Sequence, residues 1–589
     1  MRQPIPVFIA LVAGAMNVFA FAPFGYWLLQ LGCTALLFLL VMQAPCVRRA
    51  AVLGWLYSFA WTCAGVYWLY ISLHDLGGMP AWLTVLAIAL LALGLGLLVG
   101  AATGGARRLQ RRWQAGPAVT LLLILPALWT LAEWTRSWIF TGFPWLSTGY
   151  AHTEGPLGGY APLLGVYGIG FIAAFIAALL ALAIGTLLTM QRISASDAAK
   201  STTLDSTKSA ILNTAKPVVE NDPKPAQTSP AFATDLRFSH LASIAVLMAA
   251  VLIAGKFLRS LVWTEPFGKP VTVRLMQGNV PQALKFDPSA LGETLGLYDA
   301  LITQTPADLV ATPETALPVV RQMLPPQYLS QLAAFARSSG SHVLLGMPIS
   351  DSPTDYTNSL IVFDPANRLA STTAPSSTAA PSSSAQASVQ SILPAGVYRY
   401  DKHHLVPFGE FIPTGFRWFV DTMNMPLGDQ TRGAKLQAPF AVKDQWILPN
   451  ICYEDLFGEE IAAQMRWRAE QGLPMPTMLL NISNIAWFGN TIAVPQHLQI
   501  SQMRTLETGR PMLRATNTGA TAVIGADGKI LAQLPYYTRG TLATSVQGYQ
   551  GTTPFVRHGN STIIVLTAAM LAAAALWSRF QARARAAMR

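Results

Sequence analysis

The chain has 589 residues, of which 52% are hydrophobic and only 12% are charged. A typical soluble domain carries about 25% charged residues, so this composition excludes a disordered chain, a coiled coil and an ordinary cytosolic enzyme. Lys and Arg number 40 against 29 Asp and Glu, a net charge of +11, and the location of the basic residues decides what this excess means. The four cysteines are too few for a disulfide scaffold.

The missing charge reflects long apolar runs. A bilayer core of about 30 Å needs roughly 20 apolar residues per helix, and eight runs are predicted to span a membrane: about 5–22, 26–44, 50–73, 80–105, 114–132, 163–189, 238–255 and 559–578. A cleaved signal peptide is the alternative for the first run, but Pro23 directly follows the cleavage box that ends at Ala22. The chain is therefore predicted to be a polytopic α-helical membrane protein.

The placement of Lys and Arg predicts an orientation. Basic residues collect at the N-terminus, between spans two and three, between spans four and five, before span seven and in the C-terminal tail. The loops on the other side carry almost none. Both termini are therefore predicted to be cytoplasmic, with the segment 263–558 outside. The cluster Arg107-Arg108-Leu109-Gln110-Arg111-Arg112 fits a membrane anchor better than a nucleic-acid site, so no nucleic acid is expected as a partner.

Glycines recur within the fourth span, at Gly94, Gly96, Gly100 and Gly104. A dinucleotide-binding loop is one interpretation, but no strand precedes the pattern and no acidic residue follows it. Small residues every four positions predict close packing against another helix in the membrane.

Composition divides the chain into a bundle and an outer domain. The predicted parts are a six-helix membrane bundle 1–192, a disordered cytoplasmic linker 193–237, a seventh span 238–262, a globular domain 263–558, an eighth span 559–578 and a basic tail 579–589. A Ser/Ala/Thr-rich insert, 371–391, is expected to be a disordered surface loop of the outer domain.

The outer domain alternates short β-branched runs with helical patterns, which predicts an α/β fold. Strands are expected within Val271–Met276, Leu309–Ala311, His342–Gly346, Leu360–Phe363, Trp446–Leu448, Met478–Asn481 and Thr521–Ile524, and helices within Tyr328–Arg337 and Gln496–Glu507.

Three positions expected to lie at strand ends in the outer domain carry reactive side chains: Glu314, Lys402 and Cys452. Taken alone, Glu314 could be a helix N-terminal charge, Lys402 a solvated surface group and Cys452 a small buried hydrophobe. Cys452 is, however, the only cysteine predicted outside the membrane and cytoplasm, where an unpaired thiol is a liability. Catalytic and structural roles both remain open from the residues alone.

The motifs around these residues are more specific. Glu314, Lys402 and Cys452, in this chain order, resemble the Glu-Lys-Cys constellation of the nitrilase superfamily. The resemblance to the apolipoprotein N-acyltransferase family covers nearly the whole chain and rests on GFPW at 142–145, MQGNVPQALKFD at 276–287, HLVPFGEFIP at 404–413, ICYED at 451–455, AWFG at 486–489, PQH at 495–497 and RATNTGATAVI at 514–524.

This resemblance implies an extracytoplasmic αββα sandwich on a bundle of about eight transmembrane helices. The expected location is the bacterial inner membrane, with the catalytic domain in the periplasm. The implied reaction transfers an acyl chain from a phospholipid donor to the N-terminal amine of a diacylated apolipoprotein acceptor. No cofactor and no metal are expected, and the protein is expected to be a monomer.

The resemblance also implies roles for individual residues. Cys452 would attack the phospholipid ester and become a thioester, with Glu314 as general base. Lys402 and the backbone N–H of Tyr453 would stabilise the tetrahedral oxyanion. Glu410 and Glu454 match supporting positions, although Glu454 could instead be a structural ion-pair partner.

Aromatic residues near the motifs are candidates for lining or covering the lipid site: Phe286, Phe408, Phe411, Trp487, Phe488 and Trp145. Core packing is the alternative for the first five, and an interfacial anchor is the alternative for Trp145. Two positions depart from the family pattern, since Ile485 replaces an expected Asp and Phe286 replaces an expected Trp. Both departures put the substrate preference in doubt.

Two other functions fit parts of the sequence. A membrane-tethered hydrolase of the nitrilase type shares the Glu-Lys-Cys residues, but the eight predicted spans and the longer motifs favour the transferase. A transporter or channel would carry ionisable residues in the middle of its spans, and here only Glu133 and Arg136 lie near one end of span five.

Overall fold

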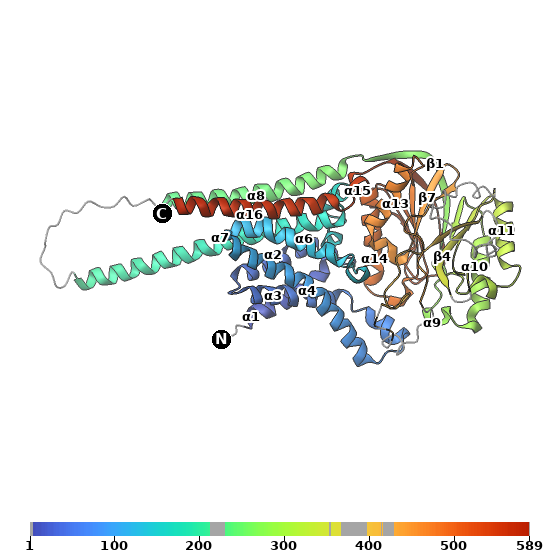
Figure 1. The fold of residues 1–589 in the computed structure, drawn as a ribbon, viewed down its shortest axis with the longest axis horizontal. Coiled ribbons are helices and arrows are strands. Elements are labelled where there is room, and N and C mark those ends of the chain that lie inside the picture. Colours follow the sequence, from blue (N-terminus) through green and yellow to red (C-terminus); the bar gives the residue numbers. More distant parts are fainter. Residues whose placement is uncertain are drawn as a thin grey trace, which may run out of the picture.

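The computed structural model describes residues 4–211, 230–352, 355–366, 397–413, 415, 417 and 429–587. A bundle of long helices forms one end of the molecule and a two-sheet α/β domain forms the other (Figure 1). The insert 371–391 lies wholly outside the described residues. Residues 212–229, in the segment that joins spans six and seven, lie outside them as well.

The bundle is built from α1 and its continuation η1, α2, α3, α4, the run α5–η3–α6, α7, α8 and α16. Their bounds are Ile5–Met16, Asn17–Ala20, Trp27–Gln43, Val47–Gly65, Ala81–Trp113, Pro117–Val119, Thr120–Ile124, Leu125–Arg136, Ala161–Ile211, Pro230–Ser260 and Ser561–Ala587. Short turns of helix connect them on the side of the α/β domain: η2 Ile71–Leu76, η4 Ile139–Thr141, η5 Thr148–His152 and η6 Pro156–Tyr160.

Five helical stretches in the described part of the chain are long and apolar enough to cross a membrane, not the eight predicted. They are Ala81–Trp113, Pro117–Arg136, Pro156–Gln191, Ser239–Ser260 and Ser561–Ala584. The first two apolar runs form shorter helices, Ile5–Ala20 and Trp27–Gln43, because the chain turns at 21–26 and again after Gln43. The third run forms α3, which has 19 residues but does not reach the same apolarity.

The prediction of a disordered linker at 193–237 differs from the structure at both ends. Helix α7 continues to Ile211 and α8 already begins at Pro230. The physical reason is that both ends continue the helices of apolar spans, and extending an existing helix needs no new nucleation. Within the predicted linker, residues 212–229 lie outside the described residues.

The glycine pattern of the fourth span packs against α3, which confirms the predicted close helix contact. A Cβ atom built on Gly104 would lie 2.8 Å from the Cβ of Ala51, and one built on Gly100 would lie 3.1 Å from the carbonyl oxygen of Ala51. Between these glycines, the hydroxyl of Thr103 donates to the carbonyl oxygen of Ala50 at 3.0 Å. The missing side chains therefore let the two backbones approach closely.

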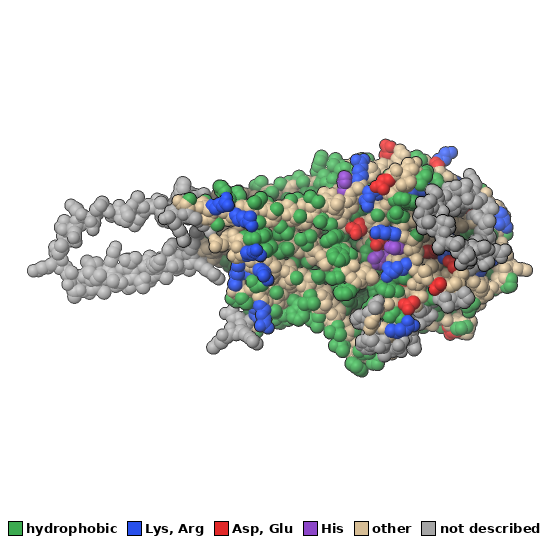
Figure 2. Space-filling view, in the orientation of Figure 1, with side chains coloured by type: hydrophobic (Ala, Val, Ile, Leu, Met, Phe, Trp, Pro, Cys, Tyr) green, Lys and Arg blue, Asp and Glu red, His purple; other side chains and the backbone are tan. Residues whose placement is uncertain are grey.

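Basic side chains gather at the end of the bundle that faces away from the α/β domain, and apolar side chains cover the bundle between the two (Figure 2). The loop before α3 and the end of α4 meet there, since Arg107 donates to the carbonyl oxygen of Ala44 at 3.0 Å. Large apolar side chains point outward along the bundle, including Phe8, Leu97, Ile253 and Val565, each more than half exposed. This surface suits a lipid environment rather than water.

The α/β domain contains two mixed six-stranded sheets. The first has the order β12-β1-β2-β3-β4-β5 and the second β11-β10-β9-β8-β7-β6. In chain order the strands β1 to β12 are Thr264–Gln277, Leu309–Ala311, His342–Ser350, Tyr356–Phe363, Val397–Asp401, Phe440–Val442, Gln445–Ile451, Met478–Ser483, Met512–Thr516, Ala522–Ile524, Ile530–Gln533 and Gly540–Gly551. Parallel pairing joins β1, β2 and β3, and likewise β7, β8 and β9.

Helices cover the outer faces of both sheets, so the layers follow the predicted αββα order. Alternate side chains of both sheets, such as Val273, Leu275, Ile447 and Leu480, form the core between the sheets. The first sheet is covered by α10 and α11, and the second by α13 and α14, which also contact the bundle (Figure 1). These helices span Leu291–Thr303, Tyr328–Ser339, Gly458–Glu470 and Ala493–Thr508; α9 is Gln282–Lys285 and α15 is Pro554–His558.

All the strands and both helices expected in the outer domain are present, so these predictions are confirmed. The strands β5, β6, β9, β11 and β12 were not expected. The strands β5, β9, β11 and β12 carry polar or small residues, and β6 has only three residues, so neighbouring strands supply the hydrogen bonds that define them.

The close contact between α3 and α4 predicts that Gly104→Leu destabilises the bundle. Its new side chain would have to displace Ala51, and overpacking of this kind typically costs about 1–3 kcal/mol. Thermal unfolding of the purified protein in detergent measures the loss. Gly94→Leu is the matched control, because nothing lies within 4 Å of a Cβ built on Gly94; equal stability of the two variants would contradict the prediction.

Candidate active site

The structure brings Glu314, Lys402 and Cys452 together at one edge of the two sheets. Glu314 lies in the loop after β2, Lys402 directly follows β5, and Cys452 directly follows β7 in the other sheet. Cys452 begins the short helix η10, Cys452–Leu456, and has a φ of 52°. This left-handed backbone is unfavourable for a residue with a Cβ and is typical of side chains held at functional turns.

Lys402 lies between two carboxylates. Its Nζ atom lies 2.7 Å from Oε1 of Glu410 and 3.2 Å from Oε1 of Glu314. The side-chain amide of Asn358, from β4, donates to the same two oxygens, at 3.0 Å and 2.7 Å. The ammonium is buried, and a buried ion of this kind is tolerated only when it is paired and hydrogen-bonded on several sides.

Charge and burial have opposite effects on the pKa values of Lys402 and Glu314. Burial disfavours the ammonium of Lys402, but the negative charges of Glu314 and Glu410 outweigh it and raise its pKa. Burial likewise disfavours the carboxylate of Glu314, yet the charge of Lys402 and the hydrogen bond from Asn358 hold its pKa below the ordinary value. Glu314 also accepts a hydrogen bond from the backbone N–H of Asn484 at 2.8 Å. Near neutral pH the site therefore contains an ionised pair.

Cys452 rests in the thiol form. Burial, and then the negative charge of Glu314, raises the pKa of Cys452 to about 12. The hydroxyl of Ser483, at the end of β8, donates to its sulfur at 3.2 Å. A thiol of this kind becomes a nucleophile only when a base removes its proton, and Glu314 is the ionised carboxylate whose charge acts on it most strongly.

Glu454 joins the loop of Lys402 to the loop of Cys452. Its carboxylate accepts hydrogen bonds from the backbone N–H groups of Ile451, His403 and His404 at 2.7, 2.7 and 3.2 Å, and from the Tyr400 hydroxyl at 3.0 Å. Burial raises its pKa to about 7, and the three amides oppose this shift. Within the described residues Glu454 forms no ion pair. The structure therefore does not support the alternative that Glu454 is an ion-pair partner.

The loop between α6 and α7 contacts the loops that carry Lys402 and Cys452. The Tyr453 hydroxyl donates to the carbonyl oxygen of Gly142 at 2.8 Å, and Nε2 of His404 lies 2.7 Å from the carbonyl oxygen of Thr141. Trp145 is buried, stacks on His497 with ring centroids 5.7 Å apart, and donates to the side chain of Gln496 at 2.8 Å. It is therefore an internal contact of the bundle with the α/β domain and not an exposed interfacial anchor.

The remaining aromatic candidates lie at different depths. Phe488 contacts Trp68 and Trp145, with ring centroids 4.2 and 6.1 Å away, so it belongs to a cluster between the bundle and the domain. Phe286, Phe408, Phe411 and Trp487 are half-buried, and Ile485 is fully buried. The side chain at 485 faces protein, which explains how an apolar residue is accommodated where the family pattern has a carboxylate.

Sequence reasoning missed a buried polar network behind Cys452. Arg514 donates to Oδ2 of Asp455 at 3.0 Å and lies 3.1 Å from Nδ1 of His497, whose Nε2 lies 3.3 Å from the carbonyl oxygen of Cys452. Asn358 and Ser483 were missed as well. Arg514 alone left a signal, since it is a charged residue inside the short strand β9, a pattern that indicates a hydrogen-bonding duty.

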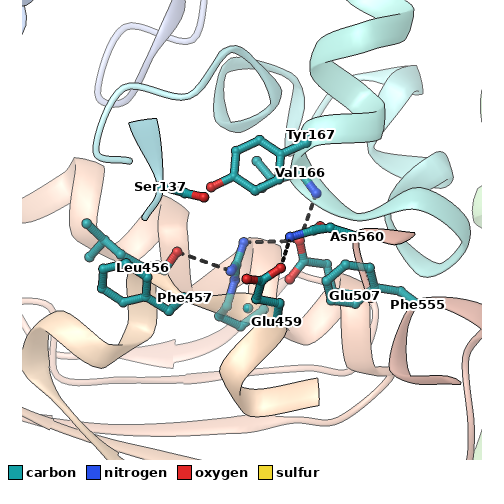
Figure 3. Close-up of a pocket in the computed structure, with 11 residues that line it drawn as sticks. Ser137, Val166, Tyr167, Leu456, Phe457, Glu459, Glu507, Phe555 and Asn560 are labelled. Atoms are coloured by element: carbon teal, nitrogen blue, oxygen red, sulfur yellow. Dashed lines mark hydrogen bonds and ion pairs between the residues drawn. The ribbon is translucent and has the colours of Figure 1, made fainter. Parts of the chain in front are cut away.

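The same face of α14 continues to the bundle. Glu507 accepts from the N–H of Val166 at 2.8 Å and from Arg504 at 3.1 Å. Figure 3 shows Glu507 and Val166 beside a cavity, whose volume is about 10 Å³. Val166 follows Gly165, which interrupts α7 with a φ of 65°. Arg504 also lies 3.5 Å from the carbonyl oxygen of Leu456, the last residue of η10. A buried ion pair thus joins the turn of the nucleophile to a membrane helix.

Metal-ligating side chains do not cluster in the described part of the chain: it contains no group of three His, Cys, Asp or Glu side chains that could hold an ion. The arrangement combines a thiol, an ionised carboxylate and a buried ammonium, which are groups that nucleophilic catalysis can use.

Comparison with known proteins divides the chain in the same way as the structure. Residues 13–179 match the apolipoprotein N-acyltransferase N-terminal domain and residues 272–554 match the carbon-nitrogen hydrolase family. Among solved structures, an amidase of the nitrilase superfamily from Nesterenkonia is 18% identical, with a TM-score of 0.32, over 48% of this chain and 92% of its own.

Curated relatives are similar over nearly their full length. The apolipoprotein N-acyltransferase of Ralstonia nicotianae is 44% identical, covering 95% of this chain and 92% of that protein. The enzyme of the same name from Bordetella bronchiseptica is 38% identical over 98% and 97%. The chain belongs to the apolipoprotein N-acyltransferase family.

Proposed function

We propose that this enzyme transfers an acyl chain from a membrane phospholipid to the N-terminal amine of a diacylglyceryl-cysteine lipoprotein, through a thioester on Cys452. Family membership supports the substrate classes. The observation that carries the mechanism is the buried group of Glu314, Lys402 and Glu410 beside the Cys452 thiol. Contacts of Tyr453 and His404 with the outer membrane loop hold this group at the bundle, where lipid substrates are present.

In the first half-reaction, Glu314 accepts the thiol proton and the Cys452 sulfur attacks the ester carbonyl carbon of the phospholipid. The carbonyl electrons move to oxygen, and the resulting oxyanion is stabilised by the Lys402 ammonium and the backbone N–H of Tyr453. Collapse breaks the carbon–oxygen bond to glycerol, and Glu314 returns its proton to the glycerol oxygen. The products are a lysophospholipid and the Cys452 thioester.

In the second half-reaction, the lipoprotein amine attacks the thioester carbon. The incoming ammonium first loses one proton to water, and Glu314 takes the second proton as the carbon–nitrogen bond forms. The carbon–sulfur bond then breaks, and Glu314 returns the proton to Cys452. Glu410 keeps Lys402 oriented, while Glu454 holds the loops of Lys402 and Cys452 together through its four hydrogen bonds.

The membrane arrangement is part of the proposal. The three shorter helices α1, α2 and α3 cross the bilayer together with the five longer stretches, which gives eight spans in the bacterial inner membrane. The basic end of the bundle (Figure 2) faces the cytoplasm with both termini, and the catalytic domain lies in the periplasm. The enzyme acts as a monomer and without a cofactor, with the half-buried Phe286, Phe408, Trp487 and Phe488 beside the lipid chain.

Intact-mass analysis tests the thioester directly. Protein incubated with phospholipid vesicles is expected to gain the mass of one acyl chain, to lose it in hydroxylamine, and to gain nothing when Cys452 is replaced in Cys452→Ala. Cys63→Ala is the matched control, because Cys63 lies in α3 of the bundle, and it should retain the adduct. An unmodified Cys452 together with release of ammonia from a small amide would instead support a nitrilase-type hydrolase.

Glu314→Gln is expected to slow thioester formation by about 10²–10⁴-fold, because the general base is lost while the shape is kept. Since the pKa of Glu314 is held below its ordinary value, protonation of this base should not make the wild-type rate fall between pH 8 and pH 6. Such a fall is expected only in acid, below the glutamate reference of about 4.3. Single-turnover acylation measured across pH checks both points, and a wild-type rate that already falls between pH 8 and pH 6 would contradict this assignment.

The orientation predicts which loops are reachable from outside the cell membrane. In a Cys46→Ala background, a membrane-impermeant maleimide added to spheroplasts should label Ser383→Cys in the insert 371–391. The same reagent should label Ser201→Cys, between spans six and seven, only after the membrane is permeabilised. The reverse pattern would overturn the orientation.

A further inference from the structure

A second buried lysine lies beside the candidate base. Lys285, the last residue of α9, donates from Nζ to the backbone carbonyl oxygen of Glu314 at 3.0 Å. Only 3% of Lys285 is exposed. Its hydrogen bond holds the main chain of the base, whereas Lys402 contacts the carboxylate.

The helix α9 is linked to the carboxylate of Glu314 as well. Gln282 accepts a hydrogen bond from the side-chain amide of Asn484 at 2.8 Å, and the backbone N–H of Asn484 donates to Oε2 of Glu314 at 2.8 Å. The side chain of Asn517 binds the backbone of Val280, two residues before α9. Its oxygen accepts from the N–H of Val280 at 3.0 Å, and its amide donates to the carbonyl oxygen of Val280 at 2.8 Å. The segment therefore holds the base at two points, its main chain and its carboxylate.

The charges around Lys285 give it a second effect. Within the described residues Lys285 forms no ion pair closer than 4.0 Å, and the negative groups that act on it are Glu314 and, once ionised, Cys452. The two carboxylates Glu314 and Glu410 exceed the single ammonium of Lys402 by one negative charge, which opposes formation of a thiolate. A charged Lys285 neutralises this excess.

We propose that Lys285 is a positioning residue of the acyl-transfer site, which fixes the main chain of Glu314 and whose ammonium favours the ionised forms of Glu314 and Cys452. Burial lowers the pKa of Lys285 to about 7, and the charges of Glu314 and Cys452 oppose this shift, so its ammonium is most populated below neutral pH. The term acyl-transfer site rests on the proposed function. The effect of Lys285 on Glu314 and Cys452 does not, because thiolate formation at Cys452 can be measured without the substrates.

Two substitutions separate the two effects. Lys285→Gln removes the charge and keeps a hydrogen-bond donor, whereas Lys285→Met removes both. The rate at which iodoacetamide alkylates Cys452 in the purified full-length protein is followed by peptide mass spectrometry between pH 6 and pH 9. Lys529→Met is the control, because Lys529 is three-quarters exposed on the turn between β10 and β11.

Both Lys285 variants should alkylate more slowly than wild type at pH 6, by at least about threefold, which corresponds to half a pKa unit or more. The difference should shrink towards pH 9, where wild-type Lys285 is itself mostly uncharged. Lys285→Met should be slower than Lys285→Gln at every pH, because Glu314 is no longer held. Lys529→Met should match wild type.

Alkylation profiles of Lys285→Gln that coincide with wild type, at an unchanged unfolding temperature, would overturn the electrostatic effect. Alkylation profiles of Lys285→Met that coincide with wild type would overturn the proposal altogether. These outcomes are independent of the acyl-transfer proposal: absence of an acyl adduct on Cys452 with displaced alkylation profiles would reject the transferase and keep Lys285 as a positioning residue.

Discussion

Burial of the Lys402 ammonium between two carboxylates is the constraint on which the rest of the site depends. An ion removed from water must recover its lost hydration from fixed partners, and removal of one partner from a buried pair typically costs about 3–5 kcal/mol. Glu314 and Glu410 supply the opposite charges, and Asn358 bonds to both of them. The strands β2 and β5 must therefore end, and β4 must begin, at the same edge of the first sheet. The arrangement leaves Glu314 ionised beside a thiol that keeps its proton, which is the state that general-base catalysis requires.

Cys452 follows a strand of the second sheet, and contacts with the bundle determine where it lies. Tyr453 and His404 each contact the outer membrane loop, and Glu507 on α14 contacts the interruption of α7. These polar contacts are buried and directional, so they align the domain on the bundle more specifically than apolar packing would. This alignment determines where Cys452 lies relative to the bundle.

Much of the fold and the central residues could be predicted because they depend on local patterns. Apolar runs long enough for a bilayer, β-branched strands and glycines at every fourth position all leave a signal within a short window. Five of the eight predicted spans are long and apolar enough to cross a membrane, and the signal is weaker in α1, α2 and α3, because the length of an apolar run does not show where a helix is interrupted. The partners Asn358, Ser483 and Lys285 could not be predicted, since each acts on a residue far away in the chain.

The sequence by itself determined that the chain is a membrane protein with an outer α/β domain, and that Glu314, Lys402 and Cys452 follow strands in a pattern of known chemistry. Hydrophobicity and residue type suffice for this, because both are properties of neighbouring residues. Only the tertiary structure decided that Lys402 is shared between Glu314 and Glu410, that Trp145 is buried against His497, and that a second lysine holds the base. Such features depend on distances between strands and helices that are remote in sequence, and burial then sets the strength and sign of each charge interaction.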